Sequence, residues 1–174
     1  MSKLPVPSLM LNTIYDLTPE QFQSMGKSML MLDLDNTMSP YHLHEPTPAL
    51  LDWIRCFQQA GIELFILSNN KGERPAIFAE ALGVDYVNRA KKPNTNMLEQ
   101  VLRDRNIDRS AVALMGDQIY TDTLCAKRAN ITAIVVKPIC ITRNPLLALR
   151  YWAEFPFRLA YLIREGVQKW KRGK

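Results

Sequence analysis

Short apolar runs alternate along the chain with longer stretches in which hydrophobic side chains recur every three or four residues. The runs are typical of strands buried on both faces, and the longer stretches are typical of helices with one inward face. Five strands are predicted, at 29–32, 64–67, 84–87, 111–115 and 131–136. Helices are predicted before, between and after them, with Thr18-Pro19 and Thr47-Pro48 as helix starts. Strands that alternate with helices predict an α/β fold with a parallel sheet covered on both faces.

The composition is that of an ordinary globular domain. The chain has 174 residues, of which 47% are hydrophobic and 22% charged, which leaves room for one buried core. Its longest uninterrupted apolar runs, 111–115 and 159–163, have five residues, whereas a membrane-spanning helix needs about 20. Three cysteines without a C-x-x-C spacing argue against a disulfide framework or a zinc site. We therefore expect a cytoplasmic protein.

The positive charge is concentrated at the end of the chain. Residues 1–149 hold 15 Lys or Arg and 15 Asp or Glu, whereas residues 150–174 hold seven and two. The whole net charge of +5 therefore belongs to the last 25 residues, and the remainder has no basic face for a polynucleotide. We expect no nucleic-acid partner, and we divide the chain into one domain at 1–149 and a basic segment at 150–174.

Polar clusters follow four of the predicted strands. They are Asp33-Leu34-Asp35-Asn36-Thr37, Ser68-Asn69-Asn70, Lys91-Lys92-Pro93 and Gly116-Asp117-Gln118, the last with Asp122 one turn further on. Any one of them could be a solvated turn. Parallel strands bring their carboxyl ends to one edge of the sheet, however, and ligands bind there. Four carboxylates, a serine and a lysine at one edge are better explained as a site.

The residue types in these clusters predict phosphoryl transfer. Clustered carboxylates repel one another and require a cation, and a set of oxygen ligands without His favours Mg²⁺ over zinc. A carboxylate can also attack phosphorus to form an aspartyl-phosphate. A lysine and a hydroxyl nearby would then neutralise and orient the phosphoryl oxygens.

The four clusters, in this order and on these elements, resemble the four motifs of the haloacid dehalogenase (HAD) superfamily of phosphohydrolases over residues 28–138. Tyr15-Asp16 and the triplet Ser68-Asn69-Asn70 are similar to the YqeG branch of subfamily IIIA. That branch is similar to the phosphatidylglycerophosphate phosphatases of mitochondria and plastids. The resemblance implies a HAD-like Rossmannoid three-layer α/β/α sandwich, here with a five-stranded parallel sheet, and a phosphatase activity.

The resemblance also implies roles for individual residues. Asp33 would be the nucleophile, and Asp35 would protonate the leaving oxygen, activate water and bind Mg²⁺ through its backbone carbonyl. The residues implied to be catalytic are Asp33, Asp35, Ser68 and Lys92; those implied to bind substrate are Ser68, Asn69 and Lys92; those implied to hold Mg²⁺ are Asp33, Asp35, Asp117 and Asp122. Asn36, Thr37 and Asn69 are interpreted mainly as residues that shape the loops.

The spacing of the motifs leaves no room for a cap domain, which phosphatases of this superfamily usually carry. Asp35 and Ser68 are 33 positions apart, and Ser68 and Lys92 are 24 apart. A helix and a strand fill each interval. By analogy, an open site favours a substrate that is too large to be enclosed or that is held in another surface.

The predicted helix at 158–172 is amphipathic, with an apolar arc of roughly 160° on a helical wheel. The arc contains Leu159, Ala160, Leu162, Ile163, Gly166, Val167 and Trp170. Two interpretations stay open. The arc packs on the core, as in most terminal helices, or it enters a membrane interface while Lys and Arg meet anionic lipid.

The main hypothesis is a Mg²⁺-dependent phosphatase that converts phosphatidylglycerophosphate to phosphatidylglycerol, peripherally bound to the inner membrane face through residues 150–174. The alternative is the same chemistry on a soluble or protein-borne phosphomonoester. A third possibility is a partner-binding protein that kept the fold without catalysis. The intact acid pair Asp33 and Asp35 argues against the third.

Overall fold

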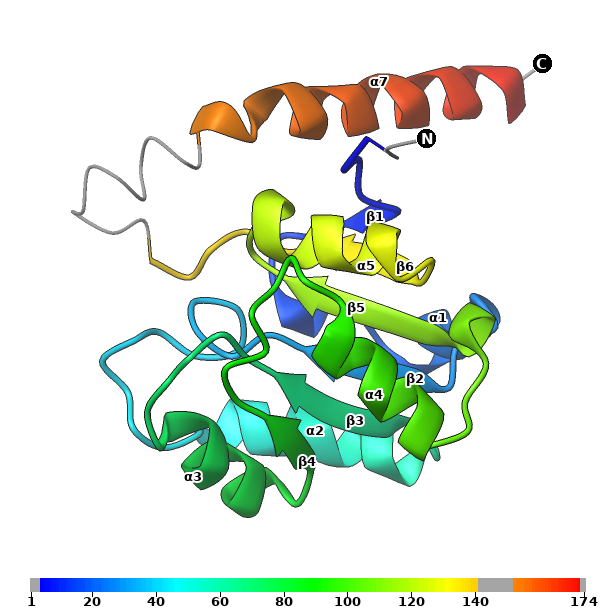
Figure 1. The fold of residues 1–174 in the computed structure, drawn as a ribbon. Helices are drawn as coiled ribbons and strands as arrows, with labels where there is room; N and C mark the ends of the chain where they lie inside the picture. Colours follow the sequence, from blue (N-terminus) through cyan, green and yellow to red (C-terminus); the bar gives the residue numbers. More distant parts are fainter. Residues whose placement is uncertain (1–3, 141–151, 173–174) are drawn as a thin grey trace.

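The computed structural model describes residues 4–140 and 152–172 and contains one parallel sheet of six strands (Figure 1). The strands are β1 (Leu9–Met10), β2 (Met29–Leu32), β3 (Glu63–Leu67), β4 (Asp85–Val87), β5 (Val112–Gly116) and β6 (Thr132–Val135). Their order across the sheet is β1-β6-β5-β2-β3-β4, and every neighbouring pair is parallel. The predicted α/β fold is confirmed.

The sheet has six strands where the sequence predicted five. The additional strand, β1, has only two residues, and it extends the edge of the sheet by pairing Leu9 with Ile134 and Met10 with Val135. Two residues leave no measurable periodicity, so this strand could not be found from the hydrophobic pattern. The five predicted strands all exist, with bounds shifted by at most one residue at either end.

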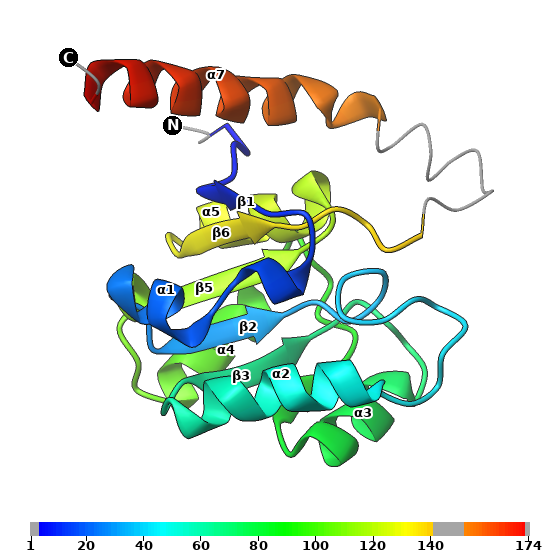
Figure 2. The same ribbon diagram turned by 180° about the vertical axis from the view of Figure 1, so that it is seen from behind.

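Helices cover both faces of the sheet. They are α1 (Pro19–Ser24), α2 (Pro48–Gln59), α3 (Arg74–Leu82), α4 (Asn96–Asp104) and α5 (Leu124–Arg128), with α7 (Phe155–Arg172) outside the sandwich. Helices α1, α2 and α3 pack on one face, and α4 and α5 on the other (Figures 1 and 2). The predicted helix starts are confirmed, because the Thr18 and Thr47 hydroxyls accept hydrogen bonds from the backbone of Gln21 and Leu50.

Two hydrophobic clusters, one on each face, form the core. Strand β2 contributes to both: Leu30 and Leu32 lie in the cluster beneath α2, and Met29 and Met31 lie in the cluster beneath α4. All four side chains are fully buried. A strand that is apolar at every position therefore lies at the centre of the sheet, where both faces are covered.

No inserted domain covers the carboxyl edge of the sheet within residues 36–91, which the structure describes completely. Helix α2 and strand β3 fill the interval between Asp35 and Ser68, and α3 and β4 fill the interval between Ser68 and Lys92. The expected absence of a cap in these two intervals is confirmed.

Helix α7 packs against the rest of the molecule by its polar side. Arg158 and Tyr161 on that side are buried, whereas Leu159, Leu162 and Ile163 on the apolar arc are 42%, 59% and 60% exposed. The helix runs past the β1 edge of the sheet (Figures 1 and 2), where the Arg164 guanidinium donates to the Pro7 carbonyl at 2.8 Å.

Neither interpretation of the terminal helix describes this arrangement alone. The helix is held on the domain, yet the described part of the apolar arc faces outward. The side chains of Val167 and Trp170 lie outside the described residues. Among the residues that the structure describes, none of the helices combines the length and the hydropathy that a membrane span requires.

Candidate active site

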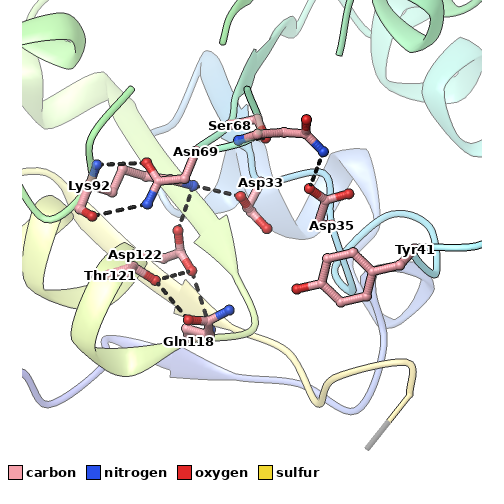
Figure 3. Close-up of a pocket in the computed structure, with 10 residues that line it drawn as sticks. Asp33, Asp35, Tyr41, Ser68, Asn69, Lys92, Gln118, Thr121 and Asp122 are labelled. Carbon is pink, nitrogen blue, oxygen red and sulfur yellow. Dashed lines mark hydrogen bonds and ion pairs between the residues drawn. The ribbon is translucent and has the colours of Figure 1, made fainter. Parts of the chain in front are cut away.

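The loops that follow β2, β3, β4 and β5 line a pocket of about 260 Å³ at the carboxyl edge of the sheet (Figure 3). It is lined by Asp33, Asp35, Tyr41, Ser68, Asn69, Asn70, Lys92, Gln118, Thr121 and Asp122. The sequence predicted six of these ten residues as site residues. Parallel strands explain the convergence, since every β-to-α loop begins at the same edge.

Lys92 lies at the inner end of this pocket between two carboxylates. Its ammonium is 2.7 Å from Asp33 Oδ1 and 2.6 Å from Asp122 Oδ1, and its side chain is almost completely buried. Burial alone would lower the pKa of Lys92, but the charges of Asp122 and Asp33 outweigh it and raise this pKa above its usual value. Lys92 therefore stays positively charged. The neighbouring Lys91 is exposed, as the choice of Lys92 for the motif requires.

Three carboxylates converge at the inner end. One oxygen each from Asp33, Asp117 and Asp122 lie within 4.8 Å of one another, and all three residues are buried. Burial, opposed by Lys92, raises the pKa of Asp33 to about 6. Burial and the charges of Asp33 and Asp122 raise the pKa of Asp117 well above its usual range. Burial and the neighbouring carboxylates thus make ionisation of Asp33 and Asp117 less favourable.

Thr37 connects two of these carboxylates, which the sequence analysis did not foresee. Its hydroxyl lies 3.1 Å from Asp33 Oδ2 and 3.4 Å from Asp117 Oδ1. Thr37 had been interpreted as shaping its loop. The sequence feature that could have indicated this contact is the spacing of four residues between Asp33 and Thr37. A loop that turns back after Asp33 brings the Thr37 side chain to the site.

The glycine of the fourth motif makes room for a carboxylate. A Cβ atom on Gly116 would lie 2.3 Å from Cγ of Asp122, a separation that real side chains do not show. The Asp122 carboxylate instead accepts hydrogen bonds from the Gln118 backbone at 3.2 Å and from the Thr121 hydroxyl at 3.1 Å. Gly116 is required because Asp122 folds back over the end of β5.

Asp35 lies at the outer rim of the pocket and has different partners. The Asn70 amide donates to its Oδ2 at 2.7 Å, and the Arg74 guanidinium pairs with its Oδ1. Arg74 also donates to the carbonyls of Leu43 and Pro40, both at 2.8 Å. Arg74 therefore fixes both the carboxylate and the loop after β2.

Sequence reasoning missed Arg74. It is the first residue of α3 and only 8% exposed, yet an arginine at a helix start normally lies in solvent. Its distance of 39 residues from Asp35 also hides the pairing. Arg74 could have been found only by expecting that Asp35 has a buried cationic partner and searching for one.

Ser68 and Asn69 complete the described site. Ser68 is 1% exposed, and its hydroxyl accepts a hydrogen bond from the Asn70 backbone at 3.1 Å. The Asn69 amide accepts from the Lys92 backbone N–H at 2.7 Å and donates to the Lys92 carbonyl at 3.0 Å. Asn69 thereby positions Lys92, in agreement with its interpretation as a residue that shapes the loops.

The inner end of the pocket suits a hard divalent cation. Three carboxylates face a single ammonium, so full ionisation of all three would leave two negative charges without a cationic partner among the described residues of the cluster. The donors are oxygens, as Mg²⁺ prefers. Occupation by a dication would offset the repulsion between the carboxylates, which adds to burial in raising the pKa values of Asp33 and Asp117.

Comparisons with known proteins agree with this chemistry. The family model of the haloacid dehalogenase-like hydrolases matches residues 10–136, which contain all the predicted site residues. A Bacillus subtilis (strain 168) protein with the name "Probable phosphatase YqeG" is 29% identical over 171 residues, which cover 98% of this chain and 99% of that protein.

Solved structures share the fold. A hypothetical protein from Xanthomonas campestris superposes with a TM-score of 0.54 at 15% identity, over 72% of each chain. The cobalt-bound deoxy-D-mannose-octulosonate 8-phosphate phosphatase of Haemophilus influenzae gives 0.50 at 11% identity, over 66% of this chain and 80% of that one. At these identities the likeness concerns the fold alone.

Proposed function

The chain belongs to the haloacid dehalogenase-like hydrolase family and is a phosphatase, and from this premise we propose that it hydrolyses phosphomonoesters through an aspartyl-phosphate on Asp33. The observation that carries the proposal is the Asp33 carboxylate, held 2.7 Å from the Lys92 ammonium at the inner end of an open pocket. Asp35, two residues further on, lines the rim of the same pocket. The nucleophile at the inner end and the acid at the rim can therefore act on the same bound substrate.

In the first step, Asp33 attacks the phosphorus atom and the bond from phosphorus to the ester oxygen breaks. Asp35 gives its proton to that leaving oxygen, and the product alcohol departs. In the second step, Asp35 takes a proton from a water molecule, which attacks phosphorus and releases Asp33 and inorganic phosphate. The positive charge of Lys92, fixed by Asp33 and Asp122, offsets the negative charge of the phosphoryl oxygens in both steps.

Ser68 and Asn69 have supporting roles in this proposal. The Ser68 hydroxyl lines the pocket and can donate a hydrogen bond to a phosphoryl oxygen while it accepts one from the Asn70 backbone. Asn69 also lines the pocket, and it fixes the backbone of Lys92 through two hydrogen bonds. We propose that both contact the substrate phosphate.

The proposed cofactor is Mg²⁺. The carboxylates of Asp33, Asp117 and Asp122 and the backbone carbonyl of Asp35 would hold it, and Thr37 would orient the first two carboxylates. When bound, the ion supplies charge stabilisation to the phosphoryl group and orients it toward the nucleophile. The oxygen-only donor set and its unbalanced negative charge support this assignment.

We further propose phosphatidylglycerophosphate as the substrate. The resemblance of the sequence to lipid phosphatases suggests it, and the open carboxyl edge supports it, because a phosphate presented by a membrane must be reached without an enclosing cap. The alternative substrate is a soluble or protein-borne phosphomonoester, which the same pocket would accept.

A peripheral position on the inner membrane face accompanies this proposal. The outward side chains of Leu159, Leu162 and Ile163 form an apolar row on α7, and the segment 150–174 carries the entire net charge of +5. An interfacial helix combines these two properties. Each Lys or Arg near an anionic surface contributes about 1 kcal/mol.

A phosphate-release assay tests the substrate. The intact protein is compared on phosphatidylglycerophosphate in mixed micelles and on soluble phosphomonoesters, with EDTA and then with excess Mg²⁺. We expect activity to vanish with EDTA and to return with Mg²⁺, and the lipid to be preferred. Full activity after exhaustive chelation would refute the metal assignment, and preference for a soluble ester would favour the alternative substrate.

Cosedimentation with anionic liposomes tests the membrane assignment. Ile163→Glu places a charge in the apolar row and should weaken binding about tenfold, since it removes apolar burial and adds repulsion. Ile77→Glu is the matched control, because Ile77 is a similarly exposed isoleucine on α3, 40% exposed. Equal binding of the two variants would refute a membrane role for α7.

A further inference from the structure

The first turns of α7 contact the loop that follows β5. Glu154, directly before the helix, is 1% exposed. Its Oε1 accepts hydrogen bonds from the backbone N–H groups of Ile119 at 2.8 Å and Tyr120 at 3.4 Å. These two N–H groups follow Asp117 closely in the chain, so Glu154 holds the loop of the fourth motif from outside the pocket.

Arg158, one turn later, contacts the same loop nearer to the carboxylates. Its Nη2 donates to the backbone carbonyl of Asp117 at 3.0 Å and to Glu154 Oε2 at 3.2 Å. Arg158 is 8% exposed. A buried ion pair stabilises a fold only when its remaining hydrogen-bonding groups find partners. Here Glu154 Oε1 and Arg158 Nη2 have such partners in backbone atoms of the segment that carries Asp117.

Aromatic contacts fix the same loop to the same helix. The Tyr120 hydroxyl donates to the Ala153 carbonyl at 2.9 Å, and the Tyr120 ring meets the Phe157 ring edge-on at 5.7 Å between centroids. Residues 119–123 form a single turn of π-helix. This conformation is rare in proteins as a whole, but where it occurs it is often at a functional site. The loop is thus held from the helix side at both its backbone and its Tyr120 side chain.

We propose that Glu154 and Arg158 are positioning residues for the metal site, holding the backbone of Asp117–Tyr120 so that the carboxylates of Asp117 and Asp122 stay directed at Asp33. The inference rests on the proposed function, because it presupposes that these carboxylates hold Mg²⁺. Residues beyond the direct ligands commonly set metal affinity in this way. The basic segment at 150–174 then supplies two residues to the catalytic unit.

The alternative role for Arg158 is to hold α7 on the domain and nothing more. Arg164 provides the control for that role. It lies on the same side of the same helix, and it donates to the carbonyls of Pro7 at 2.8 Å and Ser8 at 3.4 Å, which belong to the β1 edge and not to the pocket. Loss of either arginine loosens the helix, but only loss of Arg158 frees the Asp117 backbone.

The test measures Mg²⁺ binding by isothermal titration calorimetry in the full chain without substrate, for wild type, Arg158→Met and Arg164→Met. Truncation of Arg158 should weaken Mg²⁺ affinity about 10- to 100-fold, and truncation of Arg164 should change it less than about twofold. In hydrolysis of a soluble aryl phosphate, Arg158→Met should need more Mg²⁺ for half-maximal rate, with KM for the ester unchanged at saturating Mg²⁺.

Conservative variants separate positioning from folding. Arg158→Lys keeps a donor for the Asp117 carbonyl and should recover part of the affinity; Glu154→Gln keeps an acceptor for Ile119 and should lose less than Glu154→Ala. Thermal melting without metal verifies that each variant is folded. If a folded Arg158→Met binds Mg²⁺ like wild type, or if both arginine variants lose affinity equally, the inference is wrong. If wild type itself binds no Mg²⁺, the proposed metal site fails and the inference fails with it.

Discussion

The inner end and the outer rim of the pocket hold carboxylates with similar exposure and a different balance of charge. The Asp33 side chain is 10% exposed and that of Asp35 is 14% exposed. At the inner end, Asp33 and two further carboxylates share the single ammonium of Lys92. At the rim, Asp35 pairs with the Arg74 guanidinium and accepts a hydrogen bond from the Asn70 amide.

This difference separates two tasks that carboxylates perform. Negative charge in excess creates a place for a cation, and burial raises the pKa of Asp33 to about 6, so that the metal-free site resists full ionisation. A carboxylate with its own guanidinium is instead fixed in direction, as a group that transfers protons must be. Asp33 and Asp35 are therefore similarly buried but suited to different chemistry, because the charged groups beside them differ.

The largest expected effect is that of Asp33→Asn, which removes the nucleophile at the inner end. Hydrolysis of an aryl phosphate in Mg²⁺ buffer should fall by at least about a thousandfold. The metal-free variant should melt at the same or a higher temperature than wild type, because the fold disfavours the ionised form of Asp33. Retention of a tenth of the wild-type rate would show that the aspartyl-phosphate mechanism is wrong.

Asp35→Asn should have the next largest effect and should distinguish the rim from the inner end. General acid–base catalysis contributes about 10²–10⁴-fold, and the acid matters most when the leaving group is a poor one. Phosphate release from an alkyl phosphate should therefore fall further than release from p-nitrophenyl phosphate. Equal losses on the two esters would contradict proton donation by Asp35.

A change of pH should act on the inner end. The pKa of Asp33 is raised to about 6, so this carboxyl group is mostly ionised at pH 7 and mostly protonated at pH 5 in the metal-free protein. Protons then compete with the metal, and calorimetric Mg²⁺ affinity should be roughly tenfold weaker at pH 5 than at pH 7. Asp33→Asn should show a smaller pH dependence. If the Mg²⁺ affinity of wild type did not change with pH, the charge balance of the inner end would be contradicted.

The smallest effect is expected for Arg74→Lys at the rim. Lysine keeps a positive charge near Asp35 but cannot reproduce the hydrogen bonds to the carbonyls of Leu43 and Pro40. A lost hydrogen bond of about 1 kcal/mol corresponds to a roughly fivefold lower turnover.

Matched variants sharpen this expectation. Arg55→Lys is the control, because Arg55 pairs with Asp52 on the exposed side of α2, with 64% of its side chain exposed, and its loss should leave turnover unchanged. Arg74→Met, which removes the charge as well, should lose more activity than Arg74→Lys. Wild-type turnover by Arg74→Met would mean that Asp35 needs no partner to act.

The residues predicted from the sequence and the residues that were missed differ in their position relative to the strands. Asp33, Ser68 and Asp117 directly follow apolar strands, so the hydrophobic pattern itself places them at one edge. Arg74 and Arg158 belong to helices and Glu154 directly precedes one, and their partners lie 39, 41 and 35 residues away in the chain. Helical periodicity shows which side of a helix a residue occupies but not what that side touches.

The alternation of strands and helices, the edge at which the motifs meet and the chemistry of their side chains could all be predicted from the sequence. Each depends on local patterns and on the geometry of parallel sheets. The side of α7 that faces the domain, in contrast, is visible only in the folded molecule. The apolar arc alone predicted an inward position in one interpretation and a membrane contact in the other. Buried hydrogen bonds of Glu154 and Arg158 to the loop after β5 turn the polar side inward. These hydrogen bonds are made to backbone atoms, which every residue carries. The pattern of residue types therefore does not predict which loop Glu154 and Arg158 will contact.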